Sequence, residues 1–243
     1  MRQMKPTVHK EKSQAIIYDA NRVELPVAEQ FDAGFWNNHQ AVQGQASGRG
    51  SAWFIDTKFG PVVLRRYLRG GWAAKISREH YVFTGVLASR PFREFRLLTE
   101  LYEMGLPVPC PVAALCKHHG IFSTGAIMTM RIAGARSLAD LLSSSDITNG
   151  QWHRIWADTG RCIHRFHTAG LWHADLNAGN ILIDQQSKVF LIDFDQARLT
   201  AGTPVNGGNN LSRLNRSLLK LWPESRKSLF PAAWAGFIEA YHG

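Results

Sequence analysis

The sequence predicts an α+β fold of two lobes, in which an N-terminal antiparallel sheet with one helix precedes a mostly helical lobe. In the first lobe, short apolar runs are separated by turns that contain Gly or Pro, a pattern typical of strands. Beyond residue 148, apolar residues recur at helical spacing. The 243 residues are 45% hydrophobic and 19% charged, so we expect a globular chain with a sizeable core.

Four short elements of the first lobe are predicted from local pattern. They are an edge strand over residues 14–18, a short helix over residues 31–38, and strands over residues 111–116 and 125–130. Thr129, Met130 and Arg131 then form the expected connection to the second lobe.

A Gly-rich segment precedes an alternating strand over residues 51–55. Its glycines are Gly44, Gly48 and Gly50. A turn of this kind between two strands lets backbone N–H groups approach phosphates without a clash from a Cβ atom. We therefore expect these glycines to bind a nucleotide, although the spacing alone also fits an ordinary hairpin.

The next predicted strand, residues 61–67, reads PVVLRRY and carries two cations. It stands where protein kinases have a strand Val-Ala-Ile-Lys, whose Lys holds the nucleotide phosphates. That register favours Arg65 as the phosphate partner and leaves Arg66 as the second choice. An exposed basic strand is the alternative interpretation.

A helix is expected after this strand, with Ser89 as its N-cap and Pro91 in its first turn. The position of Glu94 early in the helix predicts an ion pair with Arg65, as in the kinase motif. Two later acidic residues, Glu100 and Glu103, are expected to face solvent.

Two capping boxes mark helix starts in the second lobe. Ser137 with Asp140 predicts a short helix, and Thr148 with Gln151 predicts a long one over residues 151–168. The chain is expected to end in an amphipathic helix over residues 231–241.

The segment 171–197, LWHADLNAGNILIDQQSKVFLIDFDQA, gives the strongest functional signal. Asn180 follows Asp175 by five residues, and Asp193 then opens an Asp-Phe-Asp turn. This order is typical of a kinase catalytic loop followed by its metal-binding turn, which makes the predicted fold protein-kinase-like. A plain hairpin whose Asp and Asn residues only form turns is the alternative.

The residue types of this segment match the needs of phosphoryl transfer. A carboxylate must accept the proton of the attacking hydroxyl, and oxygen ligands must hold Mg²⁺ on the phosphates. We therefore interpret Asp175 as the catalytic base, Asn180 and Asp193 as metal ligands, and His173 as structural. Nucleotide binding falls to residues 1–131, and the catalytic loop, metal turn and acceptor binding fall to residues 132–243.

A helix within residues 209–222 has one apolar and one basic face. The apolar face carries Leu211, Leu214, Leu218 and Leu221. The opposite face carries Arg213, Arg216 and Lys220, which fits either a solvated surface or a binding site for an anionic acceptor.

The formal net charge of +9 points to an anionic partner, which is a nucleotide, a nucleic acid or an acidic membrane surface. The three cysteines, Cys110, Cys116 and Cys162, have no metal-site spacing and fit reduced thiols. The N-terminal residues lack the apolar core of a secretory signal, and no run of about 18 apolar residues predicts a membrane span.

Together these motifs resemble the family of bacterial 3-deoxy-D-manno-octulosonic acid (Kdo) kinases of lipopolysaccharide assembly. The resemblance rests on GRGSAWF, VLRRYLRGG, REF, HADLNAGNIL and LIDFDQAR, at residues 48–54, 63–71, 93–95, 173–182 and 191–198. It implies transfer of phosphate from ATP, with Mg²⁺, to the 4-hydroxyl of a Kdo residue on Kdo-lipid A, with Asp175 as the base. It also implies peripheral attachment to the cytoplasmic face of the bacterial inner membrane, with no nucleic acid as partner.

Two departures from the protein-kinase pattern point away from protein substrates. Asn177 replaces the Lys that protein kinases keep two residues after the base, and the metal turn reads DFD. The rivals are a heptose or other small-molecule kinase, a protein kinase, and a non-catalytic binding module. The expected membrane-facing patch consists of Arg65, Arg66, Arg69, Trp72, Lys75 and Arg78.

Overall fold

The computed structural model describes residues 3–46, 52–67, 81–82, 85–119, 122–144, 147–200 and 202–243. The chain forms two compact units. Unit 1 comprises Met1–Gly105 and Pro109–Arg131, and unit 2 comprises Leu106–Val108 and Ile132–Gly243. Unit 1 holds an antiparallel sheet and unit 2 is mostly helical, so the predicted α+β class is confirmed.

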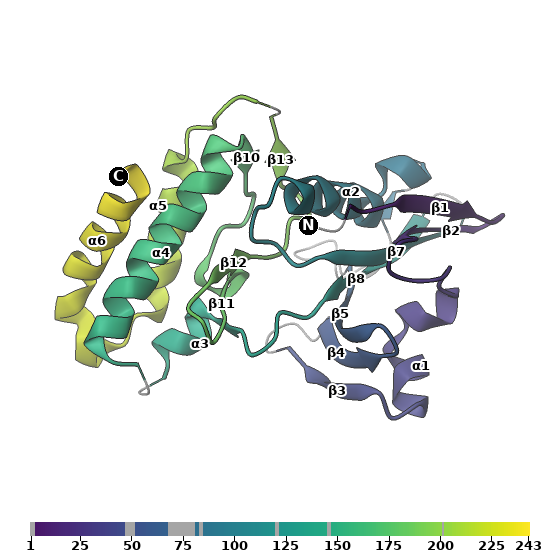
Figure 1. Cartoon of the computed structure of the whole chain (residues 1–243), viewed down its shortest axis with the longest axis horizontal. Helices are drawn as coiled ribbons and strands as arrows, with labels where there is room; N and C mark the ends of the chain where they lie inside the picture. Colours follow the sequence, from purple (N-terminus) through teal and green to yellow (C-terminus); the bar gives the residue numbers. More distant parts are fainter. Residues whose placement is uncertain are drawn as a thin grey trace. The chain divides into compact units, whose positions relative to one another are not determined.

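The sheet of unit 1 has the strand order β1-β2-β7-β8-β5-β4-β3, and β6 pairs with β8 (Figure 1). Its strands are β1 (Pro6–Lys10), β2 (Gln14–Asp19), β3 (Val42–Gln45), β4 (Ala52–Thr57), β5 (Gly60–Arg66), β6 (Tyr81–Val82), β7 (Pro111–His119) and β8 (Phe122–Met130). The prediction of an edge strand at residues 14–18 is wrong, because β1 pairs with β2 along its outer side.

The helices of unit 1 are η1 (Ala28–Phe31), α1 (Ala33–Asn38), η3 (Val86–Ala88) and α2 (Arg90–Glu103). Helix α2 packs on β7 and β8 (Figure 1) through a buried stripe of Phe92, Phe95, Leu98 and Leu101. Ser89 is its N-cap, as expected, but the Ser89 hydroxyl donates to the Val86 carbonyl instead of capping the helix.

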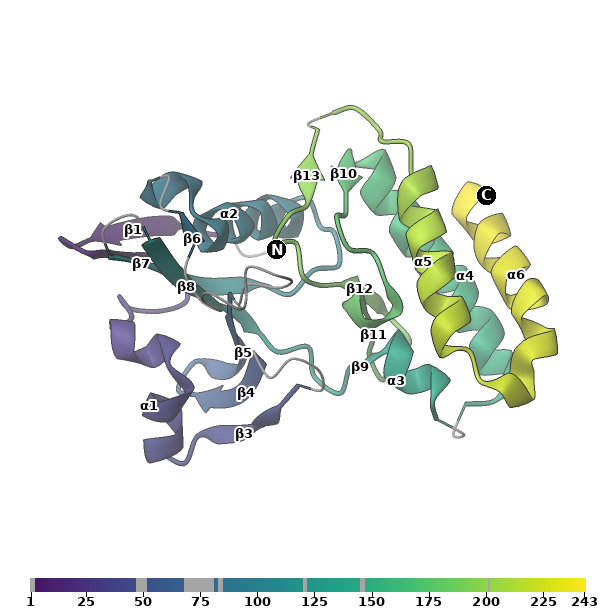
Figure 2. The same ribbon diagram turned by 180° about the vertical axis from the view of Figure 1, so that it is seen from behind.

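Unit 2 contains two small sheets. β12 (Val189–Leu191), β11 (Ile181–Ile183) and β9 (Arg136–Ser137) pair in that order, and β10 (Leu171–Trp172) pairs with β13 (Arg198–Leu199). Its helices are α3 (Leu138–Leu142), α4 (Asn149–Thr168), η4 (Ala178–Asn180), α5 (Gly208–Leu221), η5 (Glu224–Leu229) and α6 (Phe230–His242). The long helices α4, α5 and α6 run alongside one another (Figure 1 and Figure 2).

Local signals place these helices correctly. The Thr148 hydroxyl accepts from the Gln151 N–H and the Gln151 side chain returns to the Thr148 N–H, so the capping box of α4 is confirmed. On the apolar face of α5, Leu214 and Leu218 are buried. Leu221, the last residue of the helix, is 45% exposed.

Helices α4 and α6 are in close contact at Gly160. A Cβ atom there would lie 2.4 Å from the Phe237 carbonyl oxygen and 3.0 Å from the Tyr241 nitrogen, whereas at Gly236 of α6 it would meet no atom within 4 Å. We expect Gly160→Ala to lower the free energy of unfolding by about 2 kcal/mol through overpacking. The matched Gly236→Ala should raise it by roughly 0.5–1 kcal/mol through helix propensity. Denaturant unfolding measures both, and wild-type stability of Gly160→Ala would contradict the close approach.

All three cysteines are free, as predicted, and all three are buried. Burial raises the pKa of the Cys162 thiol to about 12, so this side chain packs in the core and does not act as a nucleophile. None of the helices in the described part of the chain combines the length and the apolar character that a membrane crossing requires.

Candidate active site

The predicted catalytic loop lies between β10 and β11, and the metal turn directly follows β12. Antiparallel pairing of β11 with β12 brings the two together, and the Ile192 N–H donates to the Asn180 carbonyl at 3.1 Å. Ile192, the residue before Asp193, is therefore hydrogen-bonded to Asn180. Asp175 joins the same cluster, because its carbonyl oxygen accepts from the Asn180 Nδ2 at 2.8 Å.

The Asn180 and Asp193 side chains have the chemistry of a magnesium site. The amide nitrogen of Asn180 is held by the loop, so its amide oxygen is the atom that could bind a metal. Among the described residues, no group of three His, Cys, Asp or Glu side chains is placed to hold a metal. Mg²⁺ in phosphoryl-transfer sites takes one or two protein ligands and completes its shell with phosphate oxygens and water, so the donor set fits Mg²⁺.

Asp193 has an unusual backbone conformation. Its φ is +65°, in the left-handed region that L-residues rarely adopt, although Asp tolerates it better than most. Such conformations persist where the surrounding structure enforces them and gather at functional sites. Here the conformation sets the direction in which the Asp193 side chain leaves the chain.

His173 ties the catalytic loop to the metal turn. Its side chain is buried, with 2% of the residue exposed. Its Nδ1 accepts from the Asp175 N–H at 3.1 Å, and its Nε2 donates to the Ile192 carbonyl at 3.0 Å. The structural role predicted for His173 is confirmed, since both ring nitrogens are used to hold backbone.

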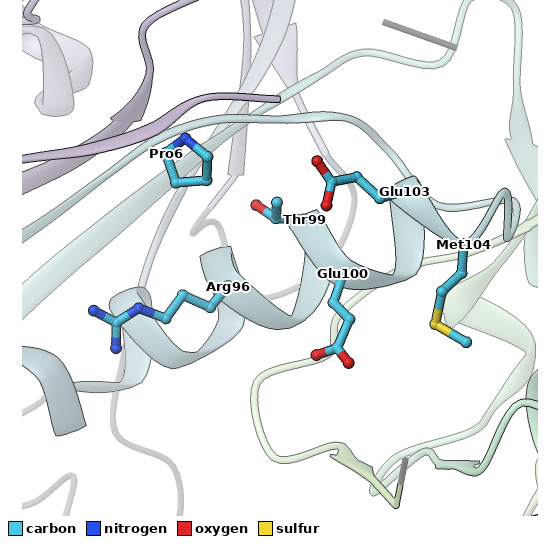
Figure 3. Close-up of a pocket in the computed structure, with 6 residues that line it drawn as sticks. All are labelled: Pro6, Arg96, Thr99, Glu100, Glu103 and Met104. Carbon is cyan, nitrogen blue, oxygen red and sulfur yellow. The ribbon is translucent and has the colours of Figure 1, made fainter. Parts of the chain in front are cut away.

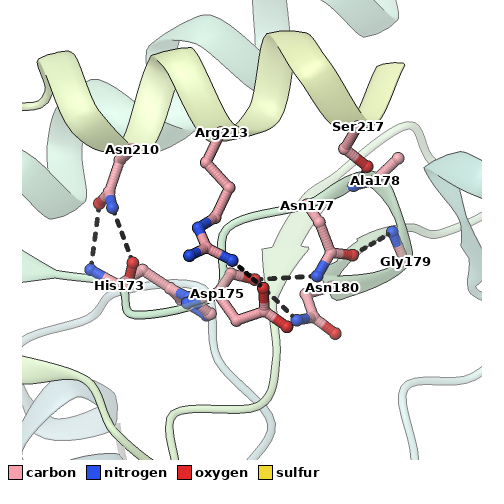
Figure 4. A network of polar contacts seen from close by, with 9 residues as sticks. All are labelled: His173, Asp175, Asn177, Ala178, Gly179, Asn180, Asn210, Arg213 and Ser217. Carbon is pink, nitrogen blue, oxygen red and sulfur yellow. Dashed lines mark hydrogen bonds and ion pairs between the residues drawn. The ribbon is translucent and has the colours of Figure 1, made fainter. Parts of the chain in front are cut away.

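A buried polar network holds this loop in place, and Figure 4 shows its contacts between Asn210 and His173. Asn210 of α5 accepts from the His173 N–H at 3.1 Å and donates to the His173 carbonyl at 2.7 Å. The Asn210 oxygen also lies 3.1 Å from His167 Nε2, and His167 Nδ1 lies 2.8 Å from the Tyr241 hydroxyl. Sequence reasoning missed Asn210. The available signal was that this polar residue lies four residues before Leu214 and therefore on the apolar face of the predicted helix.

The His167 network predicts an acid-sensitive fold. Burial lowers the pKa of His167, and the hydrogen bond with Asn210 opposes this shift only in part. The unfolded chain therefore binds more protons below the ordinary His pKa of about 6.5, and stability falls as the pH drops through that value towards the folded pKa. We expect the wild type to lose more stability between pH 7.5 and 5.5 than His167→Gln does, as measured by urea unfolding.

The control for this experiment lies on the same helix. His153 is exposed, so His153→Gln should keep the wild-type dependence of stability on pH. Equal pH dependence in His167→Gln and the wild type would show that the buried ring does not carry the effect.

Arg213 also reaches the catalytic loop from α5. Its Nη1 lies 2.8 Å from Asp175 Oδ1. One turn further along, the Ser217 hydroxyl accepts from the Ala178 N–H at 3.2 Å. Asn210, Arg213 and Ser217 thus point at the loop from one side of α5 (Figure 4), so Arg213 is not part of a purely solvated basic face. The sequence signal that was missed is the spacing of these three polar residues, at steps of three and four, which places them on one side of a helix.

In unit 1 the predicted ion pair between Arg65 and Glu94 is confirmed. Arg65 Nη2 lies 2.5 Å from both Glu94 carboxylate oxygens, and the Tyr67 hydroxyl donates to the same carboxylate at 2.6 Å. Only 3% of Glu94 is exposed, whereas Glu100 and Glu103 face solvent as predicted. Arg66 instead lies 3.8 Å from Asp32. Which arginine meets the nucleotide phosphates stays a prediction.

The expected Gly-rich turn is only partly described. Gly44 lies inside β3, opposite Phe54 at a shift of register, so its placement in a loop is wrong. Gly48 and Gly50 lie outside the described residues, as do Arg69, Trp72, Lys75 and Arg78 of the expected membrane-facing patch.

A pocket of about 370 Å³ lies beside α2 (Figure 3) but does not suit a nucleotide. Its lining residues are Pro6, Arg96, Thr99, Glu100, Glu103 and Met104. The two glutamates disfavour phosphate groups, and none of the predicted binding or catalytic residues lines this pocket.

The sheet of unit 1 and the loop-and-turn cluster of unit 2 define a kinase-like phosphotransferase. Residues 33–241 match the family described as "Lipopolysaccharide kinase (Kdo/WaaP) family". The chain belongs to this family and is an ATP-dependent sugar kinase.

Curated relatives agree with this assignment. The chain is 46% identical over 207 residues to the 3-deoxy-D-manno-octulosonic acid kinase of Stenotrophomonas maltophilia (strain R551-3), covering 85% of this chain and 81% of the relative. It is 44% identical, with the same coverage, to the 3-deoxy-D-manno-octulosonic acid kinase of Xanthomonas euvesicatoria pv. vesicatoria (strain 85-10).

Proposed function

We propose that this kinase transfers the γ-phosphate of ATP to the 4-hydroxyl of a Kdo residue on Kdo-lipid A, in the assembly of the lipopolysaccharide inner core. The observation that carries the proposal is the similarity to 3-deoxy-D-manno-octulosonic acid kinases at 44–46% identity over 85% of the chain. The loop and turn support it, because hydrogen bonds join Asp175 to Asn180 and Asn180 to Ile192, the residue before Asp193.

In the proposed reaction, Asp175 orients the sugar hydroxyl and accepts its proton. The hydroxyl oxygen bonds to the γ-phosphorus, the bond from that phosphorus to ADP breaks, and ADP leaves. Mg²⁺, held by Asn180 and Asp193, would neutralise charge on the phosphates. Arg65, held by Glu94, is proposed to bind the phosphates from unit 1. Most of the protein's contribution is then positioning and charge stabilisation.

We further propose that the enzyme works as a peripheral protein at the cytoplasmic face of the bacterial inner membrane. The formal net charge of +9 supports attraction to an anionic leaflet and to a phosphorylated lipid acceptor. Each Lys or Arg close to such a surface contributes about 1 kcal/mol, and salt weakens the attraction. Sedimentation with anionic vesicles should therefore decrease as the salt concentration rises.

The decisive experiment offers labelled ATP and Mg²⁺ with Kdo-lipid A, free Kdo or a heptose acceptor. We expect transfer to the Kdo-lipid A acceptor and, by mapping of the product, phosphate on the 4-hydroxyl. Omission of Mg²⁺ should stop the transfer. Phosphate on the heptose acceptor alone would favour the rival sugar kinase, and a failure to phosphorylate any acceptor would favour the non-catalytic module.

A further inference from the structure

The catalytic loop itself provides no cation at the position two residues after Asp175. Asn177 stands there, and both ends of its amide are used within the loop (Figure 4). Its Nδ2 donates to the Asp175 carbonyl at 3.0 Å, and its Oδ1 accepts from the Gly179 N–H at 2.8 Å. Asn177 therefore acts as a turn-forming residue, and a positive charge beside the base must come from elsewhere in the fold.

Arg213 of α5 brings such a charge to the base. Its Nη1 lies 2.8 Å from Asp175 Oδ1. The two side chains are 49% and 56% exposed, so both are accessible to an incoming phosphate and acceptor. A guanidinium has five N–H donors, and this single contact leaves the other donors of the fork to bind an anion.

The position of Arg213 is fixed by its neighbours on the helix. Asn210, three residues before it, holds both backbone groups of His173, and Ser217, four residues after it, holds the Ala178 N–H. These contacts anchor α5 to the loop on both sides of Arg213. The guanidinium therefore reaches Asp175 from a docked helix, a preorganised arrangement for stabilising charge in a transition state.

We propose that Arg213 is a catalytic residue that binds the phosphoryl group during transfer and supplies the charge that Asn177 does not. The acceptor oxygen, next to Asp175, lies in line with the γ-phosphorus, so oxygens of that group come within reach of the same guanidinium. The proton moves to Asp175, the bond to ADP breaks, and Arg213 keeps its protons and only exchanges hydrogen-bond partners. The inference rests on the phosphate transfer of the family and not on the identity of the acceptor.

The test compares kcat and KM of the wild type, Arg213→Gln and Arg213→Lys. An arginine that stabilises a transferring phosphoryl group is worth about 10³-fold or more in rate. We expect Arg213→Gln to lower kcat by roughly 10³-fold, with the KM values for ATP and acceptor changed by less than about threefold. Arg213→Lys should retain part of the rate, because it keeps the charge but loses the fork.

A matched control uses another exposed pair. Arg161 on α4 pairs with Asp158 at 2.7 Å, with side chains 59% and 37% exposed. Arg161→Gln should leave kcat unchanged. Since exposed ion pairs contribute little to stability, both Gln variants should melt within about 2 °C of the wild type.

A second variant tests the charge directly by adding Asn177→Lys to Arg213→Gln. A kcat at least about tenfold above that of Arg213→Gln would support the assignment, because the new lysine would restore a positive charge beside Asp175. Three results would overturn it: an unchanged kcat in Arg213→Gln, a loss confined to the KM of the acceptor, or a folded double variant no faster than Arg213→Gln. Failure of the proposed acceptor is separate, since it would leave the wild type itself inactive on Kdo-lipid A.

Discussion

Replacing Asp175 with Asn should reduce phosphate transfer by at least about 10³-fold while ATP binding and folding are retained. A positioned general base contributes roughly 10²–10⁴-fold, and an amide cannot accept the hydroxyl proton. The structural cost is small, because the contacts that shape the loop use the Asp175 backbone: its N–H bonds to His173 and its carbonyl bonds to Asn177 and Asn180. Single-turnover assays and calorimetric ATP titration measure the two effects.

Asp158→Asn is the matched control for this experiment. Asp158 is also an exposed carboxylate paired with an arginine, at 2.7 Å from Arg161, but it lies on α4 outside the loop. It should transfer phosphate at the wild-type rate. Comparable turnover in Asp175→Asn and Asp158→Asn would end the assignment of Asp175 as the base.

Asp193→Gly should remove catalysis and leave the fold intact. Glycine adopts the φ of +65° freely, so relief of backbone strain offsets the larger entropy of the unfolded chain. We expect the free energy of unfolding to change by less than about 1 kcal/mol. Loss of the proposed Mg²⁺ ligand should cost roughly 10³-fold in rate, since metal stabilisation of phosphoryl transfer is worth several kcal/mol.

Ser187→Gly serves as the control for the backbone effect, because Ser187 has nearly the same φ of +64° but lies in the turn between β11 and β12. It should keep both the rate and its dependence on Mg²⁺. Magnesium titrations of Asp193→Asn add a graded case, with a higher concentration needed for half-maximal rate. Wild-type activity in Asp193→Gly at low Mg²⁺ would remove this residue from the metal site.

Features encoded over a few residues could be predicted from the sequence. The N-cap at Ser137 and the capping box at Thr148 place α3 and α4, because their hydrogen bonds join residues three apart. The loop around Asp175 is recognisable for the same reason. The pair of Arg65 with Glu94 joins residues 29 apart, and it was found only because a kinase motif specifies both positions.

Features that depend on docking could not be predicted in this way. Strand β1 is short and largely exposed, so nothing in its pattern shows that it covers the edge of β2. The orientation of Asn210 and Arg213 towards the loop follows from where α5 packs, which the helical pattern leaves undecided. The pattern correctly separates an apolar from a polar side, but it does not say which part of the polar side meets Asp175.

The polar network behind the loop links the last helix to the chemistry. Hydrogen bonds run from Tyr241 through His167, Asn210 and His173 to the Asp175 N–H, and four of these five residues are at least nine-tenths buried. Local opening of a protein occurs in cooperative segments. We therefore expect opening at the end of α6 to be coupled to loss of order in the loop around Asp175.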